Sequence, residues 1–383
     1  GGAGGLITGN VQIDRHHLER VGNVVIDAKT GEDEMDGFSR WAEAAKSKGA
    51  ALVMQVSHAG RQTPKLVNPR PAAPSPVALG LPGGQFGEPR AMTADEIGAV
   101  VEGFGRAAKV AKRTGFDGIQ VHAAHGYLLS SFLSPLANRR EDDWGGPLEN
   151  RARLLVDCVR EAKVQGGAGF SVSVKLNSAD FQKGGFSHAD CLMVIDILNG
   201  LGVDFVEISG GNYEQPKMMD MEGLEPSFEE TKRTSTRDRE AYFLSYAKSV
   251  QDRASMPLMV TGGFRTLSGM NAALASGEAD LIGIGRPLCV DTATPAKLLA
   301  GEIETADRWE AQLRIGPGLF GPHSPIKLVK ALNGFGAQGW YYEQLRLLAA
   351  GKAPNPKLGV LRAFMAHQKR ETVSAKAWRA AMP

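Results

Sequence analysis

The sequence contains few cysteines, no long apolar run and no basic cluster. Its 383 residues include only Cys158, Cys191 and Cys289, and no CxxC or CxxH motif. A structural zinc site or an iron–sulfur cluster therefore lacks its usual ligands, and sparse, unpaired cysteines favour a cytoplasmic location. No apolar run reaches the roughly 18 residues that cross a membrane. A net charge of +2, with no run of more than two basic residues, is not typical of a nucleic-acid-binding protein.

What is present is typical of a globular protein with a large core. The chain is 43% hydrophobic and 22% charged, which excludes a disordered chain. Its length suggests two or three domains, but α/β barrels often exceed about 250 residues as one domain. The first residue is glycine, and no charged segment followed by an apolar one resembles a signal peptide.

Short apolar segments alternate with amphipathic ones along the chain. The short segments are β-branched and bounded by glycine, proline or polar residues, which predicts buried parallel strands. They are Gly5–Thr8, Ala51–Val56, Gly118–His122, Phe170–Leu176, Val203–Ile208, Pro257–Thr261 and Asp280–Ile284. Helices are predicted over Asp36–Ser47, Thr93–Thr114, Glu149–Lys163, Ser187–Asn199, Arg237–Arg253 and Leu267–Ser276. Thr93 and Glu96 form a capping-box pattern.

Repeated strand–helix units with parallel strands predict an α/β fold, namely a TIM (β/α)8 barrel of which seven strands are visible. Residues 63–91 and 210–236 lack periodicity and follow strand ends, where barrel enzymes place their binding loops. Helical patterns over Ile326–Leu332, Trp340–Ala350 and Val360–Lys369 indicate an appendage. We therefore predict a barrel over residues 1–295 and a C-terminal helical extension over 296–383 that packs on it.

The most polar strand end is the segment His122-Ala-Ala-His125-Gly-Tyr127. Two imidazoles can donate hydrogen bonds to one carbonyl oxygen, and a phenol can deliver a proton. A structural histidine pair, or a metal site that needs a third ligand, explains the same residues equally well.

The residues after this segment carry a longer pattern. Phe-Leu-Ser-Pro (132–135), Asn-Arg-Arg (138–140), Gly-Gly (145–146) and Leu-Glu-Asn-Arg (148–151) follow in order. Together they resemble the signature of the old yellow enzyme family, and similar motifs recur from residue 5 to about 290 and in the tail. Trp144 departs from the pattern, because tyrosine is commoner there. The resemblance implies a TIM barrel that binds FMN and acts as an NAD(P)H-dependent ene-reductase.

The resemblance also implies which residues face the flavin. The amide of Gln55 matches the glutamine that pairs with the pyrimidine edge, as its donor and acceptor allow. The backbone N–H of Gly9 faces the ring, where a small residue permits close approach. Lys175 stands where the family usually has arginine beside N1 and C2=O; it keeps the charge but lacks the bidentate fork. Without the resemblance, Gln55 is equally compatible with a polar residue that caps a strand, and Gly9 fits a simple strand-end glycine better than a cofactor role. For Lys175 the structural alternative is a lysine whose charged end reaches solvent.

A phosphate site is predicted after the last two strands. Gly262 and Gly263 follow one of them, and Gly285 and Arg286 follow the other. Loops in these positions commonly bind phosphate in barrel enzymes, because glycine exposes backbone N–H groups and arginine supplies charge. Arg265 is an alternative source of that charge. No GxGxxG motif opens a strand–helix unit, so NADH or NADPH would enter over the flavin.

The mechanism that the resemblance implies is a ping-pong reaction. NADPH or NADH reduces FMN, and an enone-type small molecule then binds in the same place. His122 and His125 hold its carbonyl oxygen, and Tyr127 protonates the α-carbon. The alternatives are an NAD(P)H oxidase or a quinone or nitro reductase with the same flavin, and a flavin-free barrel that acts as a binding protein.

Other expectations concern the ends and the remaining residues. In the family a strand precedes Gly-Gly-Leu-Ile-Thr, so we expect about 35–45 further residues at the front, enough for one strand–helix unit. We expect no resident metal, nucleic acid or membrane; a homo-oligomer is compatible with the sequence. His16 and His17 are interpreted as solvated, Tyr213 and Tyr342 as packing.

Overall fold

The computed structural model describes residues 1–217, 223, 225, 227–228 and 243–381. All seven predicted strands are present and run parallel to their neighbours. They are β1 (Gly5–Ile7), β4 (Ala51–Ser57), β7 (Gly118–Ala123), β8 (Ser171–Asn177), β9 (Val206–Ser209), β10 (Leu258–Thr261) and β11 (Leu281–Gly283). Their carboxyl ends therefore lie at one edge of the sheet.

Two short strands that we did not predict extend this sheet. β2 (Val11–Gln12) pairs with the end of β4, and β3 (Val24–Val25) pairs with β2. Within the described residues, β1 pairs with β4 and β11 with β10, and strand hydrogen bonds do not join β1 to β11. The segment 63–91 contains a separate two-stranded sheet, β5 (Ala72–Ala73) and β6 (Arg90–Ala91).

The helices between the strands follow the predicted alternation. They are α1 (Glu32–Lys46), α2 (Ala94–Arg113), α4 (Leu148–Gly166), α5 (His188–Leu201), α6 (Leu244–Gln251) and α7 (Leu267–Ala275). The capping box is confirmed, because Thr93 accepts from the backbone N–H of Glu96 and Glu96 accepts from that of Thr93. Residues 229–242, which include the start of the helix predicted over Arg237–Arg253 and part of the 210–236 loop, lie outside the described residues.

The short helix α3 (Leu128–Leu133) was not predicted. It starts directly after Tyr127, and all six of its residues are buried. A fully buried helix of only six residues has no amphipathic period, so the sequence pattern could not reveal this helix. Its position matters because it fixes the chain immediately after the polar end of β7.

The C-terminal segment contains α8 (Thr294–Leu299), the short 3-10 helices η4 (Trp309–Ala311) and η5 (Gly318–Phe320), α9 (Lys327–Ala349) and α10 (Val360–Ala381). The 3-10 helices η1 (Gly60–Gln62) and η3 (Arg286–Cys289) lie earlier in the chain. α9 is one helix where the sequence indicated two segments. Gly336 and Gly339 interrupt its apolar period, yet both lie against α10, where a β-carbon on Gly336 would come within 2.7 Å of Val360. Close helix packing, rather than a break, explains these glycines.

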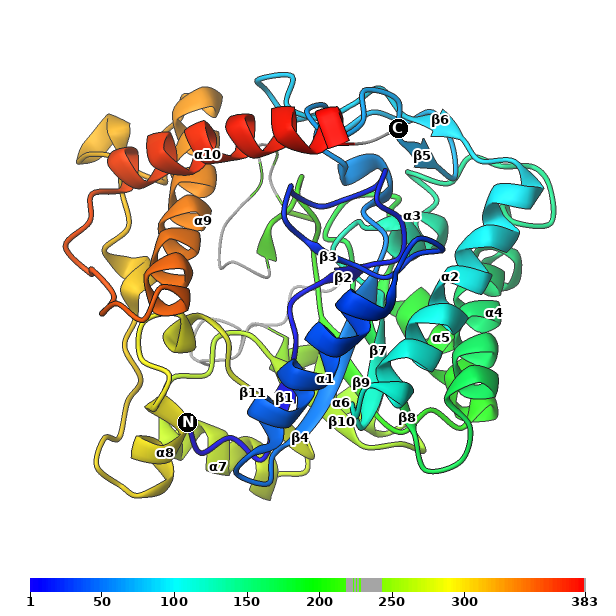
Figure 1. Ribbon diagram of the computed structural model, residues 1–383, viewed down its shortest axis with the longest axis horizontal. Helices are drawn as coiled ribbons and strands as arrows, with labels where there is room; N and C mark the ends of the chain where they lie inside the picture. The colour runs from blue at the N-terminus through cyan, green and yellow to red at the C-terminus, as the bar shows by residue number, and fades with distance from the viewer. Residues whose placement is uncertain (218–222, 224, 226, 229–242, 382–383) are drawn as a thin grey trace.

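The molecule has one large core between the sheet and its helices and a smaller one in the C-terminal segment. The smaller core surrounds Trp340, which is fully buried and whose Nε1 donates to the carbonyl of Leu358 at 2.9 Å. In Figure 1, α9 and α10 lie on the opposite side of the strands from α2, α4 and α5. None of the described helices is both long and apolar enough to cross a membrane.

Candidate functional site

A cavity of about 580 Å³ lies between the strand ends and α9. Its barrel side includes four of the predicted site residues: Gly9, Gln55, His125 and Tyr127. Its other side is formed by α9, through Lys330, Ala331, Gly334, Phe335, Gln338, Tyr342 and Leu345. The predicted extension therefore contributes a wall of the cavity, which the sequence did not indicate.

The three polar side chains at the end of β7 lie together. The ring of His122 is 5.1 Å from that of His125 and 4.9 Å from that of Tyr127, both edge to face. His125 and Tyr127 line the cavity, whereas His122 is 2% exposed and lies behind them. Nδ1 of His122 accepts from the backbone N–H of Ala124 at 3.2 Å. The neutral ring therefore carries its proton on Nε2.

His125 is held in an unusual backbone conformation. Its φ is +63°, a region that non-glycine residues seldom adopt and that often marks functional sites. Its backbone N–H donates to Asn177 at 3.1 Å, and its carbonyl accepts from Gln62 at 3.0 Å. Its Nε2 lies 2.7 Å from the hydroxyl of Ser209 on β9. These contacts fix the position of the imidazole, which lines the cavity.

Burial sets the protonation of these groups. It lowers the pKa of His122 and of His125 well below the usual value, and the nearby Lys175 cation lowers both further. Burial also raises the pKa of Tyr127 well above its usual value. Both imidazoles are therefore neutral and the phenol keeps its proton at neutral pH. The site offers neutral N–H and O–H donors, which suits a carbonyl oxygen that gains negative charge.

Gln55 and Lys175, both predicted at the ring edge, are joined by a chain of buried hydrogen bonds. The amide of Gln55 donates to Gln120 at 2.7 Å, Gln120 donates to Glu207 at 2.8 Å, and Lys175 donates to Glu207 at 2.7 Å. Glu207 was not predicted; it lies opposite Lys175 on the neighbouring strand. It balances the charge of Lys175 and fixes its position.

The predicted phosphate residues lie at the ends of β10 and β11, outside the lining of the main cavity. Gly262 and Gly263 have φ of +116° and +94°, so the turn requires glycine at both positions. The carboxylate of Glu310, from η4, lies 3.7 Å from Arg286 and 2.5 Å from Arg265. Burial alone would raise the pKa of Glu310, but the two arginines together with a backbone hydrogen bond outweigh burial and lower this pKa. An anion of the chain itself therefore faces the predicted phosphate arginines.

These residues fit FMN at both of its ends. Gln55 presents an amide at the cavity wall, and Lys175 holds a positive charge on the strand beside β7. Ahead of the glycine turn, the hydroxyl of Thr261 is buried and has no hydrogen-bond partner among the described residues. Turns of consecutive glycines with unsatisfied donors nearby are suited to a phosphate. Among the described residues, the carboxylate of Glu310 opposes a phosphate there.

The sequence missed several residues of the cavity wall. Tyr213 and Tyr342, interpreted as packing, both line it, as do Glu19 and Arg20. The guanidinium of Arg20 lies 4.3 Å from the ring centre of Tyr342, a cation–π contact. The available signal was position: Tyr213 follows the end of a predicted strand, where polar and aromatic residues of barrel enzymes meet.

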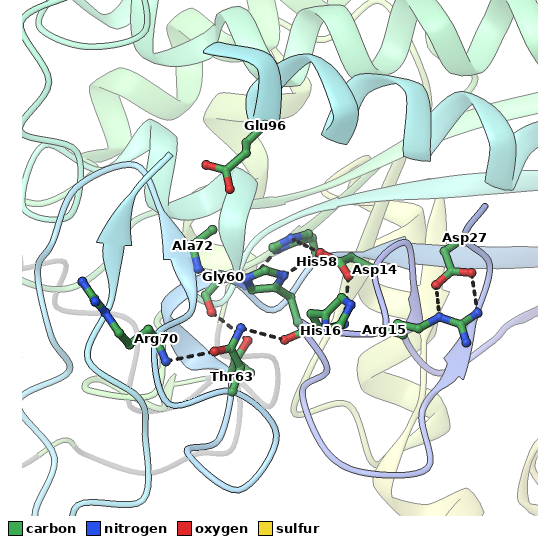
Figure 2. Close-up of polar contacts among 12 residues, drawn as sticks. Asp14, Arg15, His16, Asp27, His58, Gly60, Thr63, Arg70, Ala72 and Glu96 are labelled. Carbon is green, nitrogen blue, oxygen red and sulfur yellow. Dashed lines mark hydrogen bonds and ion pairs between the residues drawn. The ribbon is translucent and has the colours of Figure 1, made fainter. Parts of the chain in front are cut away.

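A second polar cluster lies beside a separate cavity of about 340 Å³ (Figure 2). Asp14, His17 and His58 bring their ligand atoms within 4.8 Å of one another. Asp14 Oδ2 is 2.6 Å from Nδ1 of His17 and 3.8 Å from Nε2 of His58. His17 is 7% exposed, so its interpretation as solvated was wrong. His16, the other half of that prediction, is exposed.

The hydrogen bonds of this cluster do not suit a metal ion. The backbone N–H of Ala72 donates to Nε2 of His17 at 2.8 Å, and that of Gly60 donates to Nδ1 of His58 at 3.1 Å. Each neutral ring therefore carries its proton on the nitrogen that faces Asp14. A metal-ligating histidine has the opposite arrangement, with its far nitrogen donating. The cluster instead ties the segment after β2 to the 63–91 loop.

Comparison with known proteins gives the following matches. The model of the NADH:flavin oxidoreductase / NADH oxidase family matches residues 27–304. An NADH-dependent flavin oxidoreductase of Aspergillus parasiticus is 37% identical over 311 residues, covering 80% of this chain and 68% of that protein. An NADH-dependent flavin oxidoreductase of Neonectria sp. is 37% identical over 311 residues, which are 77% of this chain and 40% of that protein. The chain thus spans less than half of the Neonectria relative.

Solved structures agree on the fold. An old yellow enzyme homologue from Zymomonas mobilis has a TM-score of 0.64 at 24% identity, covering 81% of this chain and 83% of that one. A morphinone reductase in complex with tetrahydroNAD has a TM-score of 0.62 at 25% identity, covering 79% of each chain. Both likenesses confirm the predicted barrel class.

Proposed function

The chain belongs to the NADH:flavin oxidoreductase / NADH oxidase family, and on this premise we propose that it reduces the activated C=C bond of α,β-unsaturated carbonyl compounds with NADH or NADPH. The observation that carries this proposal is the group of His122, His125 and Tyr127. The ring centre of the neutral His122 lies 5.1 Å from that of the neutral His125 and 4.9 Å from that of the protonated Tyr127. His125 and Tyr127 line the main cavity.

FMN, the cofactor of this family, supplies the hydride when it is bound. We assign the ring edge to Gly9, Gln55 and Lys175, whose donors match the polar edge of the flavin. We assign the phosphate to the turn of Gly262 and Gly263 and to Gly285 and Arg286. The hydrogen-bond chain from Gln55 to Lys175 supports the first assignment, because it pre-organises both side chains.

His122 on β7, and His125 and Tyr127 directly after it, act on the substrate. The N–H group of His125, which lines the cavity, holds the carbonyl oxygen and polarises the conjugated alkene, and His122, buried beside it, is assigned the second N–H group of this pair. Tyr127 donates its proton to the α-carbon as the β-carbon is reduced. Because burial keeps the pKa of Tyr127 high, the phenol stays protonated until the developing carbanion draws the proton.

We also propose that the barrel, residues 1–295, binds the cofactor and that the extension, residues 296–383, shapes the substrate side. Helix α9 supports this division, because its side chains form the wall of the cavity that faces Gln55 and His125. Residues of this wall would then set which enones fit.

The proposal is tested by separating the two half-reactions of Tyr127→Phe in a rapid-mixing experiment. Loss of the proton donor should slow flavin reoxidation by 2-cyclohexenone by about 100-fold or more, while flavin reduction by NADH stays unchanged. Tyr246→Phe is the matched control, since Tyr246 contacts Phe181 and His188 rather than the cavity. Intact enone turnover in Tyr127→Phe would refute the assignment.

Wild-type protein distinguishes the alternatives. If it consumes NADH with oxygen, a quinone or a nitro compound but not with an enone, it is an oxidase or reductase of those acceptors instead. A purified protein that is colourless and cannot be reconstituted with FMN would indicate a flavin-free barrel.

A further inference from the structure

Tyr127, Tyr213 and Glu19, from distant parts of the chain, form a line of hydrogen-bonded side chains at the wall of the main cavity. The hydroxyl oxygens of Tyr127 and Tyr213 are 3.0 Å apart, and the hydroxyl of Tyr213 donates to Oε1 of Glu19 at 3.3 Å. Both distances fall within hydrogen-bonding range. The two tyrosine rings are also 5.9 Å apart, edge to face. The line therefore connects the proposed proton donor to a carboxyl group.

Glu19 lies where two cavities meet. Its side chain is 8% exposed. It lines the main cavity and also a second one of about 330 Å³, which is bounded on its far side by His367, Gln368 and Glu371 of α10. Tyr213 lines both cavities as well. A proton on Glu19 can therefore be exchanged with water in the second cavity without passing through the substrate.

Charged and titratable groups from several elements face Glu19. Arg20, its neighbour, places Nε 3.6 Å from Oε2. Tyr342 of α9 and Glu371 of α10 interact with it electrostatically, and Asn23 hydrogen bonds to it. Burial raises the pKa of Glu19, and this effect outweighs the opposite effects of Arg20, Tyr213 and Asn23. Glu19 thus keeps its proton to a higher pH than an ordinary glutamate.

We propose that Glu19 supplies, through Tyr213, the proton that restores Tyr127 after each turnover. Tyr127 gives its proton to the α-carbon and becomes a phenolate; Tyr213 then passes its hydroxyl proton to Tyr127. Glu19 in turn passes its carboxyl proton to Tyr213. Glu19 is left as a carboxylate and regains a proton from water in the second cavity. This inference rests on the proposed function.

The same line sets the direction in which the Tyr127 hydroxyl points. When Glu19 is ionised, Tyr213 donates to it, so Tyr127 donates to Tyr213 and its proton faces away from the substrate. When Glu19 is protonated, each hydrogen bond reverses and the Tyr127 proton points into the cavity. Enone reduction should therefore fall as pH rises through the pKa of Glu19.

The first test measures flavin reoxidation by 2-cyclohexenone against pH. Glu19→Gln has no proton to transfer, so the alkaline fall should disappear and the maximal rate should drop by about 10-fold or more. Glu19→Asp, which keeps an acid, should restore part of the pH dependence, and Tyr213→Phe should act like Glu19→Gln. Glu43→Gln is the control, because Glu43 lies at an exposed position of α1 and lines neither cavity.

The second test needs no turnover. The Glu19 carboxylate raises the pKa of Tyr127 and of Tyr213, so tyrosine ionisation followed by ultraviolet absorbance should move to lower pH in Glu19→Gln and stay unchanged in Glu43→Gln. If wild-type protein fails to reduce enones, the proposed function is wrong, yet this titration still decides whether the line exists. Tyrosine ionisation that is the same in Glu19→Gln and wild type would overturn the inference. So would an alkaline fall that persists in Glu19→Gln.

Discussion

The Nζ atom of Lys175 on β8 lies 2.7 Å from Oε1 of Glu207, its register partner on β9. Lys175 has a side chain that is 13% exposed, and that of Glu207 is 3% exposed. A buried cation requires a compensating partner, and here the partner comes from the next strand of the sheet. The pair also ends the hydrogen-bond chain that begins at Gln55.

Glu207→Gln should destabilise the protein. The substitution leaves the charge of Lys175 without its balancing carboxylate, and breaking a buried pair in this way costs about 3 kcal/mol. Urea unfolding measures the change. Glu43→Gln, at an exposed position of α1, is the control and should change the free energy of unfolding by less than about 0.5 kcal/mol. An equally small change in the free energy of unfolding for Glu207→Gln would show that the Lys175–Glu207 pair does not stabilise the fold.

Gly263→Ala should weaken FMN binding and lower stability. The φ of Gly263 is +94°, which an alanine adopts only at a cost of about 1–3 kcal/mol. Gly285→Ala is the matched variant in the other phosphate loop, since φ there is −123° and a β-carbon would meet nothing within 4 Å. Flavin fluorescence titration should separate the two. Equal affinities would place the phosphate away from the glycine turn.

Glu310→Gln should bind FMN more tightly. Its carboxylate faces Arg265 and Arg286, so it competes with a phosphate for the same cations. Removing the negative charge of Glu310 from beside the two arginines should strengthen FMN binding by about 1 kcal/mol, or roughly fivefold to tenfold in affinity. Glu302→Gln, an exposed residue, serves as the reference. Weaker FMN binding in Glu310→Gln would mean that the carboxylate positions the arginines for the phosphate instead.

His58→Asn should reduce the sensitivity of the fold to acid. Burial, together with the neighbouring His17, lowers the pKa of His58 from 6.5 to about 4. Between these values the unfolded chain takes up a proton that the folded protein refuses, so the free energy of unfolding falls as pH falls from 6.5 to about 4. His58→Asn should remove up to about 1.4 kcal/mol per pH unit of this slope. Urea unfolding across this range provides the measurement.

The remaining acid sensitivity should persist in that variant, because the pKa values of His122 and His125 are lowered in the same sense. The same substitution at the exposed His16 controls for the change of residue type. A slope that is identical in His58→Asn and wild type would show that His58 takes no part in acid unfolding.

Local patterns were sufficient for the fold and the family. Strands of four to seven residues carry a dense apolar signal, and the capping box at Thr93 lies within one turn of chain, so each was visible without tertiary contacts. The segment from His122 to Tyr127 was visible because three reactive side chains fall within six residues at a strand end. Helix α3 and the continuity of α9 were not visible, because buried or glycine-rich helices lack a clean period.

Other features depended on segments that meet only in the folded chain. The sequence predicted His17 as a solvated residue, but the loop at Ala72 covers it in the fold. It predicted Tyr342 as a packing residue, but α9 places Tyr342 at the wall of the main cavity. Glu310, 24 residues after Arg286 in the sequence, reaches the same cations from η4. Burial, which sets the pKa values of the site histidines and Tyr127, likewise has no signature within a single segment.

Sequence alone was thus enough to identify the barrel class and its parallel strands and to propose the reactive residues at their ends, because those features depend on short-range periodicity and on motifs of adjacent residues. Only the tertiary structure paired Lys175 with Glu207 and aligned Tyr127, Tyr213 and Glu19. The physical reason is that hydrogen bonds and charge interactions act over a few ångströms of space, whereas these partners are separated by 32 to 194 positions along the chain.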